Sequence, residues 1–161
     1  RKLQNGAGIS HVIQEFETQM DKMEIVLGPY SLKQMKKSGR VSAAAAVVGD
    51  LLGIRPIISL NAGVSKVEAK VRGDAAVPPA MIKWVESRVD SMKDTPYMVA
   101  YTSSTAKRDE LVKLCKKNFG HAPMIVFQLG GVVSANTGPD GIAIVFEGKP
   151  RRLVDYAVPL P

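Results

Sequence analysis

The segment from Ile54 to Val71 most constrains the fold, because its pattern predicts two strands that fold back on each other. Ile54 to Leu60 is a short apolar run, and Val67 to Val71 alternates apolar with polar residues. Such runs are typical of a buried strand followed by a half-buried one. Asn61-Ala62-Gly63 lies between them and predicts a short hairpin loop. The sheet of this protein should therefore contain an antiparallel pair.

Helical and extended patterns alternate along the rest of the chain. The predicted helices are Ala7 to Met23, Ser31 to Lys37, Ser42 to Gly53, Pro78 to Met92, and one that follows the capping run Thr102 to Thr105. The further predicted strands are Glu24 to Gly28, Pro96 to Tyr101, Met124 to Leu129, Val132 to Ala135 and Ile142 to Phe146. These elements predict an α+β fold with α/β character, in which helices pack on a mixed, mainly antiparallel sheet.

The length of 161 residues suits a single core. We expect one domain over residues 1–148, with residues 1–23 as a leading helix, and a tail over residues 149–161. The start, Arg1 to Gly6, has neither an initiator methionine nor an apolar leader, so we expect an excised piece of a longer protein.

Composition excludes several classes of protein. Apolar residues make up 45% of the chain and charged residues 23%, which is typical of a folded domain and not of a disordered one. The longest apolar stretches run about 10 residues, whereas a membrane span needs about 20. The single cysteine, Cys115, cannot form an intrachain disulfide, which favours the cytoplasm.

The net charge of +7 raises the alternative of a basic domain that either binds nucleic acid or has a regulatory role. Lysines are spread over several segments and aromatics are only 6% of the residues, so no aromatic, basic platform is predicted. A solvated basic surface is the simpler interpretation.

One stretch combines an anion site with an apolar wall. Arg40 follows Ser38-Gly39 and precedes the helix predicted from Ser42, whose first amide groups carry partial positive charge. An arginine there can grip a carboxylate through two hydrogen bonds. The apolar wall beside it includes Ala43, Ala46 and Val47. This layout suits a fatty acid, although a helix cap with a solvated arginine has the same pattern.

Several motifs in register resemble the DegV family of lipid-binding proteins. They run from Leu32 to Ser42, from Leu51 to Ile58, from Val67 to Gly73 and from Asn136 to Ile142, and the resemblance spans about Gly6 to Gly148. It implies a non-catalytic protein of two domains that holds a long-chain fatty acid and presents its carboxylate to a fatty acid kinase. The amino-terminal domain of that pair would be absent from this chain, and no cofactor is implied.

The resemblance also implies roles for single residues. Arg40 is similar to the arginine of the family's carboxylate network, and Arg72 to an arginine that engages the kinase. Asn136 stands where the family usually has histidine, so its contact with a carboxylate would lack the charge of an imidazolium. Asp140 stands where glycine is common, and its charge is unfavourable near a carboxylate unless it points away.

Other candidates for chemistry have simpler explanations. A rival interpretation, a small-molecule transferase that uses Arg40 and Asp50, lacks an activated partner group. The remaining candidates are better explained as follows: His11 and His121 are too far apart in the sequence for a metal site, Cys115 has no base and fits a core thiol, and Ser103 and Ser104 fit helix caps.

Overall fold

The computed structural model describes residues 2–39, 53–61 and 64–149. They form a six-stranded sheet in the order β3-β2-β1-β6-β4-β5, in which β4 and β5 run parallel and all other neighbours are antiparallel. The strands are β1 (Met23–Gly28), β2 (Ile54–Asn61), β3 (Val64–Arg72), β4 (Tyr97–Tyr101), β5 (Ile125–Gln128) and β6 (Ile142–Glu147). The predicted fold class and the predicted hairpin are both confirmed.

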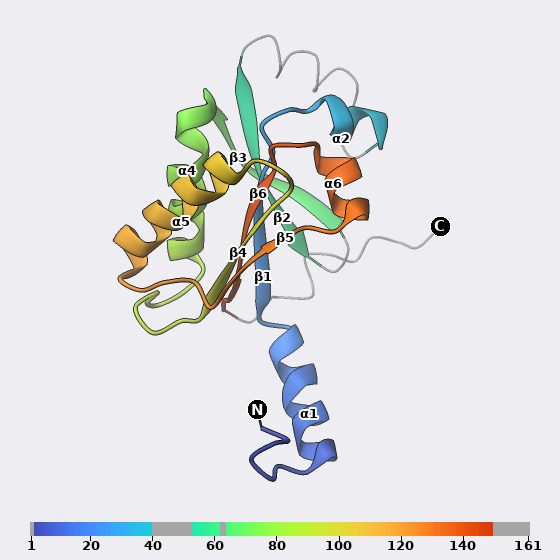
Figure 1. The fold of residues 1–161 in the computed structure, drawn as a ribbon, viewed down its shortest axis with the longest axis vertical. Coiled ribbons are helices and arrows are strands. Elements are labelled where there is room, and N and C mark those ends of the chain that lie inside the picture. The colour runs from blue at the N-terminus through green and yellow to red at the C-terminus, as the bar shows by residue number, and fades with distance from the viewer. Residues whose placement is uncertain (1, 40–52, 62–63, 150–161) are drawn as a thin grey trace.

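Helices lie on both sides of this sheet. The helices are α1 (Ile9–Met20), α2 (Lys33–Lys37), α4 (Val77–Ser87), α5 (Thr105–Phe119) and α6 (Gly131–Thr137), with a short 3-10 turn η1 (Asp74–Ala76) before α4. Helices α4 and α5 lie on one side of the sheet, α2 and α6 lie together on the other, and α1 extends away from the end of β1 (Figure 1). We call the side with α4 and α5 the helix face and the opposite side the open face.

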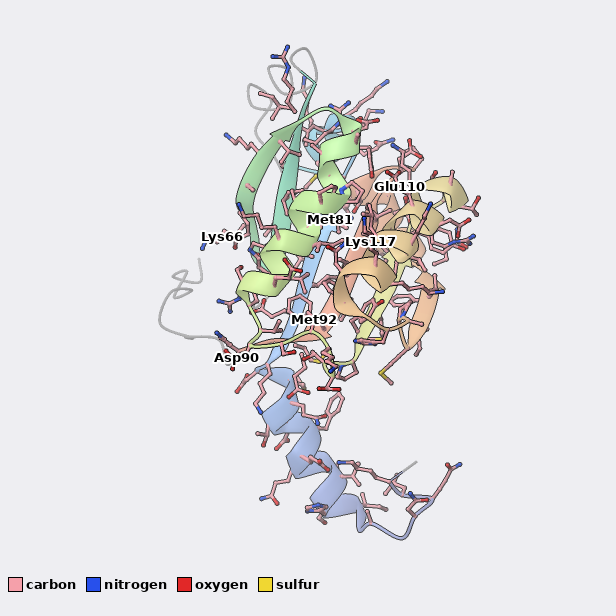
Figure 2. The ribbon with its side chains drawn as sticks, turned by 90° about the vertical axis from the view of Figure 1, so that its left-hand side faces the viewer. Lys66, Met81, Asp90, Met92, Glu110 and Lys117 are labelled. Carbon is pink, nitrogen blue, oxygen red and sulfur yellow. The ribbon has the colours of Figure 1, made fainter. Side chains whose placement is uncertain are left out.

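The helix face holds the larger core. Side chains of alternate strand residues, such as Val26, Val99 and Ile144, are fully buried there against Met81 and Leu111. The view onto this face shows α4 and α5 in front of the strands, with Met81 on α4 (Figure 2). Burial of this many large apolar side chains is the main source of the domain's stability.

One glycine explains how closely α4 approaches the sheet. A Cβ at Gly28, the last residue of β1, would lie 2.5 Å from Val77 Cγ1 and 2.7 Å from Met81 Sδ. Only a residue without a side chain allows this contact, so α4 packs directly on the backbone of β1.

Two helix ends follow the predicted signals. The Ser104 hydroxyl caps α5 by accepting from the amide of Lys107 at 3.4 Å, and Gly120 ends the helix in the left-handed conformation at φ 82°. Gly39 ends α2 with φ 70°, as the Ser38-Gly39 pair predicts.

The structure corrects three predictions. Val132 to Ala135, predicted as a strand, lies within α6, where the Ser134 amide bonds the Gly130 carbonyl at 3.0 Å. A short run with two β-branched residues does not by itself distinguish a buried strand from a helix turn. Helix α4 ends at Ser87 and not at Met92. The helix predicted over Ala7 to Met23 ends at Met20, and Met23 already belongs to β1. The helix predicted from Ser42 lies outside the described residues.

Candidate functional site

An apolar row crosses the whole open face, with one residue from each strand. Cross-strand pairing places these residues directly beside one another: Val67, Ile58, Leu27, Ala143, Ala100 and Phe127. Paired residues of neighbouring strands point to the same face of a sheet, so the six side chains form one continuous row. We call it the first row.

A second row runs beside the first, nearer to the start of β1. It consists of Ile25, Val145, Met98 and Ile125, which are paired in that order across β1, β6, β4 and β5. Ile25, Val145 and Met98 are half-buried, and Ile125 is 51% exposed. The two rows give the open face an apolar surface several strands wide.

Among the described residues, those at the start of α2 lie over the first row, and Ile25 of the second row packs at the side of the cluster that they form with it. Leu32, which precedes α2, and Met35 within it are about as buried as Leu27 and pack in the same cluster as Ala100 and Ala143. Leu32 and Met35 therefore shield the centre of the first row from water, whereas the side chains of the second row stay in partial contact with water. This second row offers an apolar floor for a ligand or for another part of the protein.

The contact between α2 and α6 depends on a glycine in the Asn136 to Pro139 motif. Gly138 has φ 94°, and a Cβ there would meet Gln34 Cγ of α2 at 3.4 Å. Both the backbone conformation and the space favour glycine. Gly138 of this motif therefore allows the chain to turn from the end of α6 towards β6 while it stays in contact with α2.

Asn136, a predicted ligand-binding residue, lies on α6 and is half-buried. Its side-chain amide donates to the Val132 carbonyl at 2.7 Å. An amide nitrogen carries two hydrogens, so this bond uses one donor and leaves a second, together with the Oδ1 acceptor. The position neither requires nor excludes a carboxylate contact.

The other predicted ligand-binding residues, Arg40, Ala43, Ala46 and Val47, lie outside the described residues. The described residue before Arg40 is Gly39, at the end of α2, and α2 contacts α6. Assignment of a carboxylate site to Arg40 and Asn136 therefore stays a prediction.

Arg72, the predicted partner-binding residue, is exposed at the end of β3 and is paired with Ile54 of β2. A charged cluster lies close to it in the sequence and on the same end of the sheet. Asp74 accepts from Arg55 Nε at 2.9 Å and from Lys107 Nζ at 3.3 Å. Burial raises the pKa of the Asp74 carboxyl, but hydrogen bonds from Arg55 and Lys107 outweigh it, so the net pKa is lowered.

Tyr30 is a buried polar residue that the sequence analysis did not single out. Its ring lies 3.2 Å from Lys107 Nζ, measured to the ring centroid, which is a cation–π contact. Its hydroxyl is buried and has no hydrogen-bond partner among the described residues. Burial, followed by the nearby charges of Glu110, Asp74 and Asp140, raises the pKa of this hydroxyl, so it stays neutral. A tyrosine two residues after a strand carries no distinctive sequence signal.

Ser104 and Cys115 fit their simpler interpretations, whereas Ser103 is not the cap of α5, because its hydroxyl donates to the Pro139 carbonyl. Cys115 is fully buried, and burial raises the pKa of its thiol to about 12, so the inert thiol form dominates. His121 is held by backbone carbonyls, with Nε2 at 2.8 Å from the Met92 oxygen. Within the described ranges, no group of three or more metal-ligating side chains occurs.

Comparison with known proteins decides the family. Residues 1–149 match the family model described as "Uncharacterised protein, DegV family". The chain belongs to the DegV family. A similar relative is a fatty acid-binding protein of Thermotoga maritima, 25% identical over 152 residues, which cover 93% of this chain and 53% of that protein.

Two solved structures share the fold of this DegV-family chain. A DegV family protein of Eubacterium eligens loaded with heptadecanoic acid aligns with TM-score 0.77 at 21% identity, over 92% of this chain and 53% of that one. The Streptococcus pneumoniae Fatty Acid Kinase (Fak) B3 protein loaded with linoleic acid aligns with TM-score 0.76 at 17% identity, over 92% and 52%.

The chain spans about half the length of the curated relatives it matches. Among the described residues, no helix is both long enough and apolar enough to span a membrane.

Proposed function

We propose that this chain is the carboxy-terminal part of a carrier that binds a long-chain fatty acid and catalyses no reaction. The observation that carries the proposal is the half-exposed second row beside the covered first row. Removal of apolar surface from water contributes roughly 25 cal/mol per Å². An acyl chain laid along Ile25, Val145 and Met98 would therefore gain free energy, because these side chains keep part of their surface in water in the part of the chain that the structure describes.

The names of similar proteins support this class of ligand. One relative is called a fatty acid-binding protein, and one structural neighbour is loaded with heptadecanoic acid. The lone Cys115 thiol fits a reducing compartment, so we place the carrier in the cytoplasm.

The carboxylate, in this proposal, lies near the ends of α2 and α6. Asn136 is on α6, and α2 ends at Lys37, three residues before Arg40. Arg40 would supply the charge and Asn136 a neutral donor, while Ala43, Ala46 and Val47 would flank the first carbons of the acyl chain. The amino-terminal half of the longer protein would complete the polar network.

The test is lipid extraction of the full-length protein followed by mass spectrometry. We expect a long-chain fatty acid to copurify at close to one per protein. A protein free of fatty acid that binds DNA, with affinity falling steeply as salt is added, would instead support the nucleic-acid alternative. Turnover of a small molecule without bound lipid would support the transferase alternative.

A finer proposal is that the carrier presents its ligand to a fatty acid kinase through Arg72. Support comes from the exposure of this side chain at a strand end and from the neighbour named as a Fatty Acid Kinase (Fak) B3 protein. We expect Arg72→Ala to slow acyl-phosphate formation by the purified kinase about threefold to tenfold, because rim charges mainly change association rates. Lys70→Ala, two residues away on the same exposed strand, is the matched control. Equal rates for both variants would remove Arg72 from the kinase interface.

A further inference from the structure

Lys107 connects the buried core of the helix face to the turn that follows Arg72. Its Nζ lies 3.2 Å from the centroid of the Tyr30 ring and 3.3 Å from Asp74 Oδ2. The Tyr30 ring belongs to that core and is only 6% exposed, so it offers the ammonium group a fixed aromatic surface. Lys107 lies in the first turn of α5, which Ser104 caps. The core therefore holds Lys107, and Lys107 in turn holds Asp74.

Asp74 uses both of its carboxylate oxygens in one cluster. Oδ1 accepts from Arg55 Nε at 2.9 Å, and Oδ2 accepts from Lys107 Nζ at 3.3 Å. The side chains of Arg55 and Lys107 are only 17% and 23% exposed, whereas that of Asp74 is 51% exposed. The two cations are thus the better packed members, and Asp74 is the member that they hold. We call Asp74, Arg55 and Lys107 the Asp74 cluster.

The turn after Arg72 is a place where such support matters. Arg72 ends β3, which pairs only with β2 among the described strands, and strand ends open more readily than strand centres. Gly73 follows with φ 81°, a conformation that glycine tolerates best. The Gly73 amide donates to the Gly53 carbonyl at 2.8 Å, which connects the turn to the residue before β2. The Asp74 cluster adds a connection to β2 through Arg55 and one to α5 through Lys107.

The same contacts keep the Asp74 carboxylate from Arg72. These two residues carry opposite charges and lie two positions apart, so a free carboxylate at Asp74 would attract the guanidinium. Both Asp74 oxygens are engaged elsewhere, and Arg72 is exposed and forms no ion pair with any residue that the structure describes. The guanidinium of Arg72 therefore keeps its donors for a partner protein.

We propose that Lys107 is a positioning residue for Arg72. By holding Asp74 against β2 and α5, Lys107 orders the turn after Arg72 and leaves the guanidinium free for a kinase. A partner then meets an arginine whose backbone is already ordered, which lowers the entropic cost of binding. The inference rests on the kinase contact proposed above and identifies the part of the fold that supports it.

The test compares Lys107→Met with Lys113→Met in the full-length protein, assayed with the purified kinase. Methionine keeps an unbranched apolar side chain and removes the charge, and Lys113 is an exposed residue of the same helix. We expect Lys107→Met to raise KM for the carrier about threefold, with kcat and bound fatty acid unchanged, because only association through Arg72 is weakened. Lys113→Met should match the unaltered protein. Lys107→Arg should restore KM, since arginine also stacks on aromatic rings and bonds carboxylates.

Two further measurements separate positioning from a general loss of structure. In an Arg72→Ala background, Lys107→Met should cause no further rise in KM, because its effect passes through Arg72. Hydrogen exchange of the Gly73 amide requires no kinase, and it should be at least about threefold faster in Lys107→Met than in Lys113→Met.

An unchanged KM or unchanged Gly73 exchange in Lys107→Met would overturn the proposal, as would a rise in KM that persists in the Arg72→Ala background. Loss of bound fatty acid from Lys107→Met would also overturn it, because the residue would then act on the ligand site. In these cases a raised KM in Arg72→Ala alone leaves the kinase contact intact. If Arg72→Ala itself leaves KM unchanged, the kinase contact fails and this inference fails with it.

Discussion

The two faces of the sheet are both apolar, but the described helices bury one of them more completely than the other. On the helix face, Val26, Val99 and Ile144 have no exposure to water. On the open face, their strand neighbours Ile25 and Met98 are half-buried. The same strands therefore serve stability with the helix-face side chains and the first row, while the second row keeps surface for a ligand or a partner.

The largest effect is expected between substitutions at two adjacent residues of β6, which point to opposite faces of the sheet. Ile144→Ala should cost about 2–5 kcal/mol of unfolding free energy, because it leaves a cavity under α4 and α5. For a domain of this size that lowers Tm by roughly 5–15 °C. Val145→Ala, on the open face, should cost less than about 1 kcal/mol. Thermal unfolding of both variants measures the difference, and equal losses would show that the open face is as tightly packed as the helix face.

The next effect concerns the charged end of the proposed ligand. Arg40→Ala should lower fatty acid affinity of the full-length protein about thirtyfold or more, since truncation of one member of a buried charge pair costs roughly 2–5 kcal/mol. Arg40→Lys should restore affinity only in part, because lysine lacks the planar two-pronged donor. A folded Arg40→Ala variant that binds as tightly as the unaltered protein would remove Arg40 from the site.

A smaller effect is expected along the second row. Met98→Ala should lower fatty acid affinity about fivefold, or about 1 kcal/mol of lost apolar contact, with little change in Tm. Val99→Ala, the next residue of β4, should do the opposite and lower Tm while affinity stays unchanged. Titration of a fluorescent fatty acid and thermal unfolding test the pair, and affinity loss in Val99→Ala alone would assign the acyl chain to the other face.

The smallest effect lies at the rim of the helix face. The pKa of Asp74 is lowered in the folded state, so its ion pairs with Arg55 and Lys107 add stability above the unfolded pKa and lose it as pH falls through the lower folded pKa. Because the Asp74 side chain is half exposed, solvent screening keeps this contribution below about 1 kcal/mol. Asp74→Asn should reduce Tm slightly at neutral pH and flatten its decline below about pH 4. Parallel pH profiles for the two proteins would contradict this.

The sheet and most elements could be predicted because each strand has a continuous apolar or alternating pattern. The hairpin around Asn61 and the glycine ends at Gly39 and Gly120 follow from local chemistry. The prediction of a strand over Val132 to Ala135 is wrong, because the segment forms helical backbone bonds from Gly130 to Gly138 and leaves Val132 80% exposed. A run this short does not distinguish the helical period from the extended one.

The site was less predictable than the fold. The sequence pointed to Arg40 and Asn136 through motifs, but the open-face rows depend on cross-strand register, which pairs Ala100 with Ala143 across 43 positions of sequence. Such register follows from the assembled sheet and not from any single strand.

The two edges of the sheet differ in their protection. Edge strand β3 carries Lys66 and Lys70, whose charges discourage pairing with another chain. Strand β5 has no charged residue and pairs on one side only among the described strands, and Met124 and Ile125 at its start are 69% and 51% exposed. When this chain is produced by itself, β5 is therefore the place where edge-to-edge aggregation should begin, and a single lysine introduced there is the simplest route to a more soluble sample.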